Sequence, residues 1–300
     1  MLAVTVDVED WYHIPMVTGT TFSKYKDVQE FLQNWNGRYD YLTEPTGRML
    51  QILDDFNLKA TFFVVADVTE LYPGLVEQIA SRGHEIACHG LHHACKTSSR
   101  TKEPLMSQGE FEERTVRARE MLEKASGQKV IGYRAPAAYV SGWMIDSLEK
   151  LGFKYDSSVS VNSLYNKTDS VLRGVDSRPY YPRVGSLEPG DKRGILELPW
   201  PYLDFGLKFP TGGGPMLRFF GARYIMLGLK QSLKRGPTIF YVHPIDICEE
   251  RFPVGFSRHR PFFWAIKGWI VESRIRWILN NLDTRLVCCR DMLDGKENLN

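Results

Sequence analysis

The chain lacks three features that would each assign it to a familiar class. It has only five cysteines in 300 residues, and neither their odd number nor their spacing fits a disulfide framework, which indicates a reducing compartment. No apolar run approaches the roughly 20 residues that span a bilayer. The first residues also lack the basic and apolar regions of a secretory signal. We therefore expect a cytoplasmic protein with at most peripheral contact with the inner face of the membrane.

An excess of charge of one sign is also missing. The chain has 38 Lys and Arg residues against 36 Asp and Glu residues, a formal net charge of +2. Proteins that bind nucleic acid usually have a basic surplus, so we do not expect a nucleic-acid partner. The glycine-rich stretch 211–215 lacks the Lys-Ser/Thr pair of a phosphate loop, so it predicts a flexible turn at a backbone corner, with no nucleotide cofactor.

Segments of strand length alternate with amphipathic helical segments along most of the chain. Strands are predicted at residues 2–6, 59–66, 86–88, 129–133, 153–156, 195–198, 238–242 and 284–288, and helices at 46–56, 73–82, 111–125, 143–151, 216–233 and 262–282. This order is typical of a parallel α/β barrel or an open parallel sheet. A chain of this length accommodates one barrel with insertions.

We assign the barrel to residues 1–250, with insertions at about 11–40 and 160–194. Residues 251–300 are predicted to form a C-terminal extension that packs on the barrel. The predicted helices at 216–233 and 262–282 combine apolar, aromatic and basic residues, so they could also contact a membrane surface.

Four of the seven histidines lie within ten residues of one another, at His84, His89, His92 and His93. Neutral imidazole is the commonest metal ligand in proteins. His89 and His93 are four apart, so they can point to one side of a helical turn and share one ion. His92 and the more distant His13 are candidates for supporting roles, and His84 for a structural one. The spacing alone leaves open a purely structural interpretation of the segment.

Ionisable residues follow several of the predicted strands at the point where each strand ends. They are Asp7, His89, Arg134 and His243. Parallel barrel enzymes assemble their sites from the residues at this end of their strands. We therefore expect these four side chains to meet in one site.

The motifs around these residues resemble those of the polysaccharide deacetylases with the NodB homology domain, the carbohydrate esterase family 4 type. The matching stretches are T-V-D-V-E-D at 5–10, H-G-L-H-H at 89–93, R-A-P at 134–136 and V-H-P at 242–244. The first motif is most similar to the exopolysaccharide-associated branch. The resemblance implies a distorted (β/α)7 barrel and a divalent metal, usually zinc, held by two histidines and a carboxylate.

The resemblance assigns His89 and His93 to the metal and Asp7 to the role of catalytic base. The family's metal-binding aspartate follows the base directly, but Val8 occupies that position here. Glu9 and Asp10 are both candidates for the third ligand. Residues two apart on an extended chain face the same way, so Glu9 can reach the ion from beside Asp7.

The remaining roles follow from the chemistry of amide hydrolysis. A general acid must protonate the departing amine, and His243 is the candidate. Arg134 resembles the family arginine that pairs with the base. A backbone N–H near Ala137 or Ala138 is expected to stabilise the oxyanion. Glu197 could orient His243.

Substrate contacts are expected from side chains close to these motifs. The candidates are Trp11, Tyr12, His13, Pro136, Ala137 and Trp200. Aromatic rings among them can stack on pyranose faces. The family motif commonly has an aromatic residue after the proline, where this chain has Ala137.

The predicted function is a metal-dependent N-deacetylase in bacterial surface-polysaccharide biosynthesis, a hydrolase of linear amides. Its substrate would be an N-acetylated sugar, glycan or lipid-linked saccharide. Two alternatives stay open: a metal-independent amidohydrolase on the same barrel, and a catalytically silent carbohydrate-binding homologue. The sequence does not predict the oligomeric state.

Overall fold

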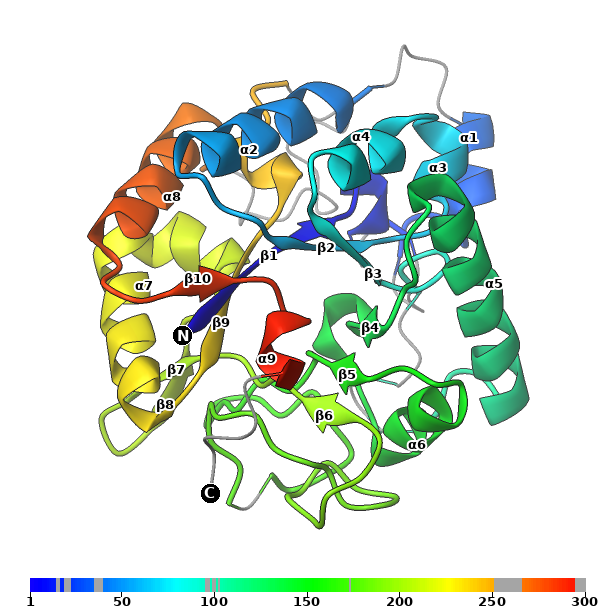
Figure 1. Ribbon diagram of the computed structural model, residues 1–300. Coiled ribbons are helices and arrows are strands. Elements are labelled where there is room, and N and C mark those ends of the chain that lie inside the picture. The colour runs from blue at the N-terminus through cyan, green and yellow to red at the C-terminus, as the bar shows by residue number, and fades with distance from the viewer. Residues whose placement is uncertain are drawn as a thin grey trace.

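A curled parallel sheet lies at the centre of the molecule, with helices on its outer side (Figure 1). The computed structural model describes residues 1–14, 17–18, 23–34, 40–94, 98, 101, 103–172, 174–250 and 266–294. Eight strands form the sheet in the order β10-β1-β2-β3-β4-β5-β6, and β9 also pairs with β1. Among the described residues no ladder joins β6 to β9, so the sheet closes only partly.

The elements follow the predicted alternation. The sheet strands are β1 Leu2–Val8, β2 Thr61–Val64, β3 Glu85–Cys88, β4 Gly132–Tyr133, β5 Tyr155–Asp156, β6 Leu196–Glu197, β9 Thr238–Val242 and β10 Leu286–Val287, and a separate antiparallel hairpin joins β7 Tyr202–Asp204 to β8 Lys208–Pro210. The helices are α1 Val28–Asn34, α2 Thr43–Asp55, α3 Val68–Leu71, α4 Leu75–Ser81, α5 Gln108–Ser126, α6 Gly142–Lys150, α7 Gly214–Arg235, α8 Trp269–Asn281 and α9 Asp291–Asp294. Short 3-10 helices are η1 Trp11–His13, η2 Pro136–Ala138 and η3 Pro244–Ile247.

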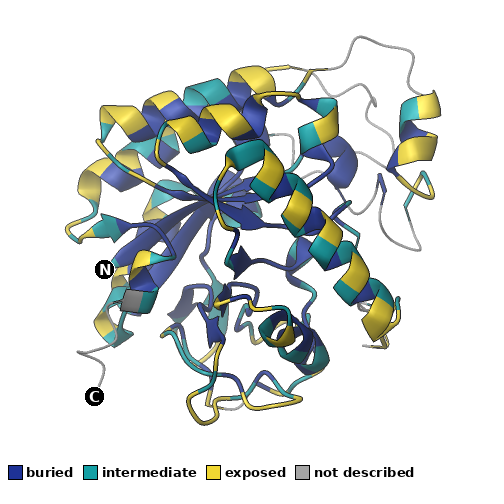
Figure 2. Cartoon of the chain, turned by 45° about the vertical axis from the view of Figure 1, so that its right-hand side comes forward, coloured by how far each residue is buried: buried dark blue, intermediate teal, exposed yellow. Residues whose placement is uncertain are grey.

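The first strand shows how the sheet is buried on both of its faces. Every residue of β1 is buried. Its even-numbered residues join the core between sheet and helices, whereas Ala3 lies in a second core inside the barrel with Phe63 and Tyr155. Figure 2 shows the same division, with buried strands and with helices that expose only their outer faces. Because side chains alternate along a strand, Asp7 points to the interior and Val8 to the helical layer.

The parallel register brings the ends of distant strands together. β1 pairs with β2 over Thr5–Val8 and with β9 over Leu2–Val6, and β2 pairs in turn with β3. The residues that follow these strands therefore meet at one edge of the sheet. The expectation of a distorted (β/α)7 barrel is confirmed in the form of this curled, partly closed parallel sheet.

The glycine-rich stretch 211–215 packs tightly against the backbone of β9, so the expectation of a flexible turn is wrong. Gly213 bridges to Tyr241 of β9, and Gly212 O accepts the N–H of Tyr241 at 2.8 Å. Gly213 has φ +138°, and a Cβ there would lie 1.6 Å from Tyr241 O. Only glycine fits such an approach. The corner therefore fixes the start of α7 beside β9.

The predicted insertions differ from each other in structure. Within 11–40, η1 and α1 share a small core around Trp11, Tyr12 and Phe31, while residues 15–16, 19–22 and 35–39 lie outside the described part of the chain. The described residues of the stretch 160–194, which leave out residue 173, form no helix or strand, and a bridge between Tyr180 and Glu197 joins the stretch to the sheet.

The C-terminal part adds to the main sheet. α8 packs against α7 and η3, and β10 pairs with β1. The predicted domain boundary at residue 250 stays a prediction, and residues 251–265 lie outside the described part of the chain.

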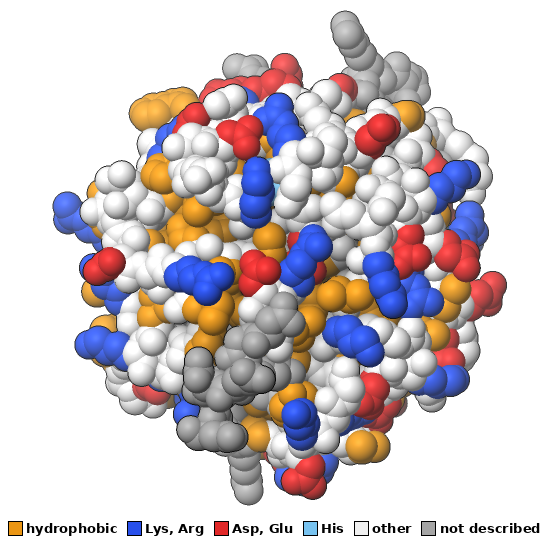
Figure 3. Space-filling model, viewed as in Figure 1, with side chains coloured by type: hydrophobic (Ala, Val, Ile, Leu, Met, Phe, Trp, Pro, Cys, Tyr) orange, Lys and Arg blue, Asp and Glu red, His pale blue; other side chains and the backbone are white. Residues whose placement is uncertain are grey.

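Surface charge and helix length bear on the expected partners of the chain. Acidic and basic side chains are interspersed on the face in Figure 3, as the near balance of charge leads one to expect. In the described part of the chain, no helix is both long and apolar enough to cross a bilayer. The cysteines described, Cys88, Cys248, Cys288 and Cys289, are buried thiols.

Candidate metal and catalytic site

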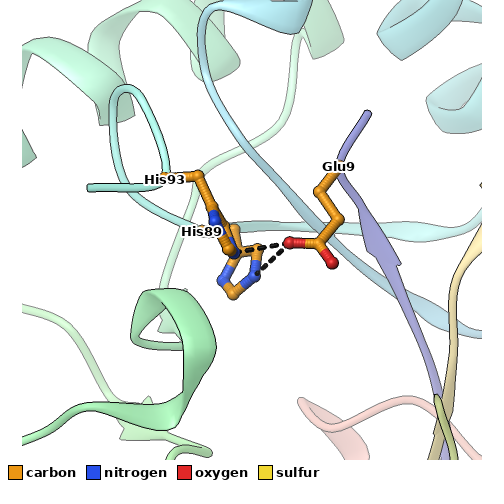
Figure 4. Close-up of side chains that lie close together, drawn as sticks. All are labelled: Glu9, His89 and His93. Carbon is orange, nitrogen blue, oxygen red and sulfur yellow. Dashed lines mark ion pairs between the residues drawn. The ribbon is translucent and has the colours of Figure 1, made fainter. Parts of the chain in front are cut away.

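Three side chains of metal-binding residue types converge at the edge of the sheet where β1 and β3 end. Glu9 follows β1, His89 follows β3, and His93 lies four residues farther on (Figure 4). Glu9 Oε2 is 2.5 Å from His93 Nε2 and 3.9 Å from His89 Nε2. One ligand atom from each residue lies within 4.8 Å of the others. The three side chains thus form a cluster of the size that one metal ion occupies.

The segment between the two histidines is a bend, so the predicted helical turn is wrong. Gly90 has φ +83° and His93 has φ +53°, both in the left-handed region. Gly90 O accepts the N–H of Ala66 at 2.9 Å, and Leu91 O accepts that of Asp67 at 3.1 Å. The glycine permits the reversal, and the bend is held against the chain that follows β2.

Backbone carbonyls set the tautomers of both histidines. Nδ1 of His89 lies 2.8 Å from Arg134 O, and Nδ1 of His93 lies 2.8 Å from His13 O. A carbonyl oxygen can only accept, so each Nδ1 carries the hydrogen and each Nε2 presents a lone pair. Metal-binding histidines are commonly oriented in this way.

The contact between His93 and Glu9 fits a cation. Within the part of the chain that the structure describes, buried His93 Nε2 has no hydrogen-bond partner, yet it lies 2.5 Å from a carboxylate oxygen. Two groups that both present lone pairs repel each other unless a positive charge lies between them. Two imidazole nitrogens and a carboxylate are also a typical zinc donor set. The residues present therefore fit a divalent metal.

The electrostatics of the cluster favour the protonation states that a metal requires. Burial favours the neutral form of Glu9, but the neighbouring histidine rings, His243 among them, hold the pKa of Glu9 below its usual range. Burial lowers the pKa of His89, and His93 lowers it further. Glu9 is thus an anion and His89 is neutral, as ligands must be.

Asp10 lies apart from the cluster, so the interpretation of this residue as a metal ligand is wrong. Its carboxylate accepts the N–H of Trp11 at 2.6 Å and the hydroxyl of Tyr72. The first of these contacts caps η1 at its N-terminus, and the second joins Asp10 to the segment after α3. Of the two candidate carboxylates, the structure therefore brings only Glu9 to the histidine pair.

His84 is remote from the cluster, in accordance with its expected structural role. It is fully buried, and its Nδ1 accepts the N–H of Ala60 at 3.2 Å. Its ring packs on Phe62 with ring centroids 5.0 Å apart. Its hydrogen bond with Ala60 therefore links the residue before β2 to the segment before β3.

Asp7 and Arg134 form a buried ion pair beside the cluster. Asp7 Oδ1 is 2.5 Å from Arg134 Nη1, which also donates to Thr5 Oγ1 at 3.0 Å. Arg134 is fully buried and donates two more hydrogen bonds to Ser157, at 2.9 Å each. Burial raises the pKa of Asp7, and Arg134 counteracts part of that rise. Asp7 is therefore a carboxylate held in one orientation that readily accepts a proton.

His243 lies beside the second carboxylate oxygen of Glu9 and is paired with Asp246. His243 Nε2 is 3.4 Å from Glu9 Oε1, and its Nδ1 is 2.9 Å from Asp246 Oδ2. Asp246 also forms a buried ion pair with Arg218. Burial opposes protonation of His243, but Asp246 and Glu9 raise its pKa to about 9. His243 is therefore a cation at neutral pH that can donate a proton.

The partner of His243 is Asp246, so the interpretation of Glu197 in that role is wrong. Glu197 Oε1 accepts the backbone N–H groups of Ser158 and Val159, at 3.2 and 2.9 Å. It supports the loop after β5. Asp246 and Arg218 are not among the residues predicted from the sequence. The i,i+3 spacing from His243 to Asp246 across a proline was the available signal, because a residue at that spacing can cap a short helix.

The aromatic residues expected to stack on sugars are buried. Exposure is 2% for Trp11 and 0% for both Tyr12 and His13. Trp200 packs on Tyr241, with ring centroids 4.4 Å apart, and donates its N–H to Ser157 O at 2.9 Å. The interpretation of Trp11, Tyr12 and Trp200 as stacking surfaces is therefore wrong. His13 contacts the site through its carbonyl group and through its ring, whose centroid lies 5.8 Å from that of His93.

Pro136 and Ala137 lie in η2, which Ala135 alone separates from Arg134. Pro136 is buried and Ala137 is half-buried. Ala137 and Ala138 have φ +53° and +60°, and the N–H of Ala138 donates to Ala135 O at 3.0 Å. Of the two backbone donors proposed for an oxyanion, the one of Ala138 is thus engaged within the turn.

Two family models match the chain, and together they include most of this site. Residues 36–155 match the model described as polysaccharide deacetylase, and residues 167–287 match a domain of unknown function, DUF3473. The first range contains the two metal-site histidines and Arg134, and the second contains His243 and Asp246. Asp7 and Glu9 precede both ranges.

A curated relative is a peptidoglycan deacetylase from Helicobacter pylori, with 26% identity over 243 residues. The match covers 79% of this chain and 66% of the relative, just under two thirds of its length.

Solved structures share the fold. A crystal structure from Mycobacterium smegmatis, of a protein assigned to the polysaccharide deacetylases, superposes with a TM-score of 0.62 at 22% identity, covering 97% of this chain and 87% of that one. A CE4 family pseudoenzyme from Bacillus anthracis has a TM-score of 0.52 at 12% identity, covering 98% and 65%. At these identities the likeness concerns the fold alone.

Proposed function

Because this chain belongs to the polysaccharide deacetylase family, we propose that it is a metal-dependent N-deacetylase acting on an N-acetylated sugar of a bacterial surface polysaccharide. The reaction consumes water and yields acetate and a free amine. One observation carries the proposal: Glu9, His89 and His93 converge with both Nε2 lone pairs aimed inward. A buried carboxylate and a histidine cation lie on either side of them.

Glu9, His89 and His93 would hold a divalent ion, and we propose zinc. When bound, such an ion supplies a Lewis acid that polarises an amide carbonyl and lowers the pKa of a water molecule. The buried Nδ1 hydrogen bonds of both histidines keep the site in its binding form without rearrangement.

Asp7 and His243 would divide the proton transfers between them. Asp7 takes a proton from the attacking water, and Arg134 keeps its carboxylate aimed at the site. His243 gives a proton to the amide nitrogen as the C–N bond breaks, because an amine leaves far more readily than an amide anion. Asp246 holds the ring in place and favours its charged form.

The class of substrate follows from the reaction and from the relatives. A peptidoglycan deacetylase is among the similar proteins, and we propose an N-acetylhexosamine within a glycan, either polymeric or lipid-linked. Assignment to exopolysaccharide assembly and a cytoplasmic location both stay predictions.

Metal content and acetate release test the proposal together. Purified protein should contain one equivalent of zinc and release acetate from N-acetylated chitooligosaccharides or peptidoglycan fragments. The variant His89→Ala should lose both, whereas His84→Asn should keep both, because asparagine can still accept the N–H of Ala60.

Two results would each replace the proposal with another function. Full hydrolysis by metal-free protein would indicate a metal-independent amidohydrolase. Glycan binding without acetate release from any of these substrates would indicate a catalytically silent carbohydrate-binding protein.

A further inference from the structure

A buried carboxylate with no part in the proposed chemistry lies beneath the bend that carries His93. Asp67 follows β2 and is 3% exposed. Its Oδ1 and Oδ2 lie 3.0 and 3.2 Å from His13 Nε2, and Oδ2 also lies 3.1 Å from His92 Nδ1. Asp67 thus joins two histidines that are 79 positions apart in the chain (92 − 13).

His13 connects Asp67 to the metal site. Its Nδ1 accepts the backbone N–H of Asp10 at 3.0 Å, so its hydrogen is on Nε2 and is donated to Asp67. Its carbonyl oxygen accepts the Nδ1 hydrogen of His93 at 2.8 Å. The position of that carbonyl group therefore determines how the His93 ring is oriented.

The other contacts of Asp67 hold the bend itself. The backbone N–H of Asp67 donates to Leu91 O at 3.1 Å, and the neighbouring Ala66 donates to Gly90 O at 2.9 Å. The side chain of His92 is 43% exposed and forms its hydrogen bond with Asp67 from the solvent side of the bend. Asp67 is thus bonded both to the bend that carries His93 and to the residue whose carbonyl orients its ring.

We infer that Asp67 is a positioning residue for the metal site, acting through His13 on the orientation of His93. The inference rests on the proposed metal site. Asparagine has the same shape as aspartate but no charge and only one acceptor oxygen. The hydrogen bond from His13 Nε2 would then lose its charge assistance, even where the exposed His92 changes tautomer to accept from the new NH₂ group, so the support of His93 would loosen.

The variant Asp67→Asn tests this with zinc affinity and a spectroscopic signal. We expect zinc binding, measured by competition with a chelator, to weaken by about 10-fold to 100-fold, the usual cost of removing an indirect partner of a metal ligand. The visible absorption spectrum of the cobalt-substituted protein should also change, since it reports ligand geometry. The matched control Asp54→Asn alters an exposed pair with Arg82 and should leave affinity and spectrum unchanged.

Two substitutions of His13 test the same link if Asp67→Asn does not fold. In His13→Gln the amide nitrogen can replace Nε2 and donate to Asp67, whereas in His13→Asn the side chain is too short to reach it. The variant His13→Gln should therefore retain the zinc affinity and the cobalt spectrum of the wild type better than His13→Asn does. Equal affinities for these two variants would overturn the inference.

The wild-type protein distinguishes this inference from the proposed function. If it binds no zinc, the metal site and the inference both fail. If it binds zinc and Asp67→Asn binds equally well with the same cobalt spectrum, only the role of Asp67 is refuted.

Discussion

Each end of the central sheet buries a glutamate, and the two glutamates differ in their surroundings. At the end where the strands begin, Glu85 accepts hydrogen bonds from Thr61 Oγ1 at 2.6 Å, Tyr155 Oη at 3.0 Å and Arg290 N at 3.1 Å. Burial raises its pKa, but both of its oxygens have donors. At the other end, Glu9 Oε1 lies 3.4 Å from the His243 cation, but Glu9 Oε2 faces His93 Nε2, which presents a lone pair.

The difference shows that burial of a charged group does not by itself indicate a functional site. A carboxylate whose oxygens all meet donors contributes to the stability of the fold. A carboxylate that faces other acceptors has its interactions completed only when a cation binds. We therefore expect substitutions at Glu9 and around it to affect binding and catalysis, and substitutions at Glu85 to affect stability.

The largest effect is expected from Glu9→Gln. Loss of the anionic ligand should weaken zinc binding by more than about 100-fold, beyond the usual cost of losing an indirect partner, and acetate release should fall with it. Zinc at 100 times its dissociation constant adds about 2.7 kcal/mol of stability, so a chelator should lower the Tm of the wild type. Thermal unfolding with and without chelator checks this, and an equal shift in Glu9→Gln would contradict the assignment of Glu9.

Asp7→Asn should reduce kcat by about 100-fold to 10,000-fold, the usual contribution of a general base. Zinc content should stay at the wild-type value, because Asp7 lies next to the metal cluster without belonging to it. Steady-state acetate release and metal analysis on the same preparation provide the test. Loss of zinc in this variant would assign Asp7 to the metal instead.

Asp246→Asn should change the pH dependence of kcat/KM. His243 must be protonated to act as an acid, and Asp246 contributes to raising its pKa to about 9. Removal of that charge lowers the pKa toward the ordinary value of about 6.5. Activity should then be lost at a lower pH on the alkaline side, and an unchanged alkaline limb would argue against His243 as the acid.

The smallest effect on activity is expected at the opposite end of the sheet. Glu85→Ala leaves buried donors of Thr61 and Tyr155 without their acceptor, which should lower the free energy of unfolding by about 1–3 kcal/mol. The kcat of the folded protein should not change. Denaturant unfolding measures the free energy of unfolding, and acetate release measures kcat. A loss of kcat comparable to that of Asp7→Asn would contradict the assignment of Glu85 to stability alone.

The order of strands and helices, and the main residues of the site, could be predicted from the sequence. β1 and β9 are apolar runs that end at an ionisable motif, and parallel strands end at one edge of a sheet. This reasoning was sufficient to group Asp7, His89, Arg134 and His243. The structure places His89 and His243 beside Glu9, and it pairs Asp7 with Arg134.

The direction of side chains in irregular segments could not be predicted in the same way. Asp10 and Glu9 are adjacent, but the start of η1 turns Asp10 toward Tyr72. Trp11 and Tyr12 follow the motif, but a small core around Phe31 buries them. Strand periodicity does not extend into such segments, so their side chains follow contacts with distant parts of the chain.

By itself, then, the sequence determined which residues lie at the ends of the parallel strands, because regular strands convert sequence order into spatial position. Only the tertiary structure decided which carboxylate joins the histidines, that Asp246 accompanies His243, and that Asp67 lies beneath the bend. The physical reason is that hydrogen-bond partners of buried polar groups are selected by packing between segments that the sequence places far apart.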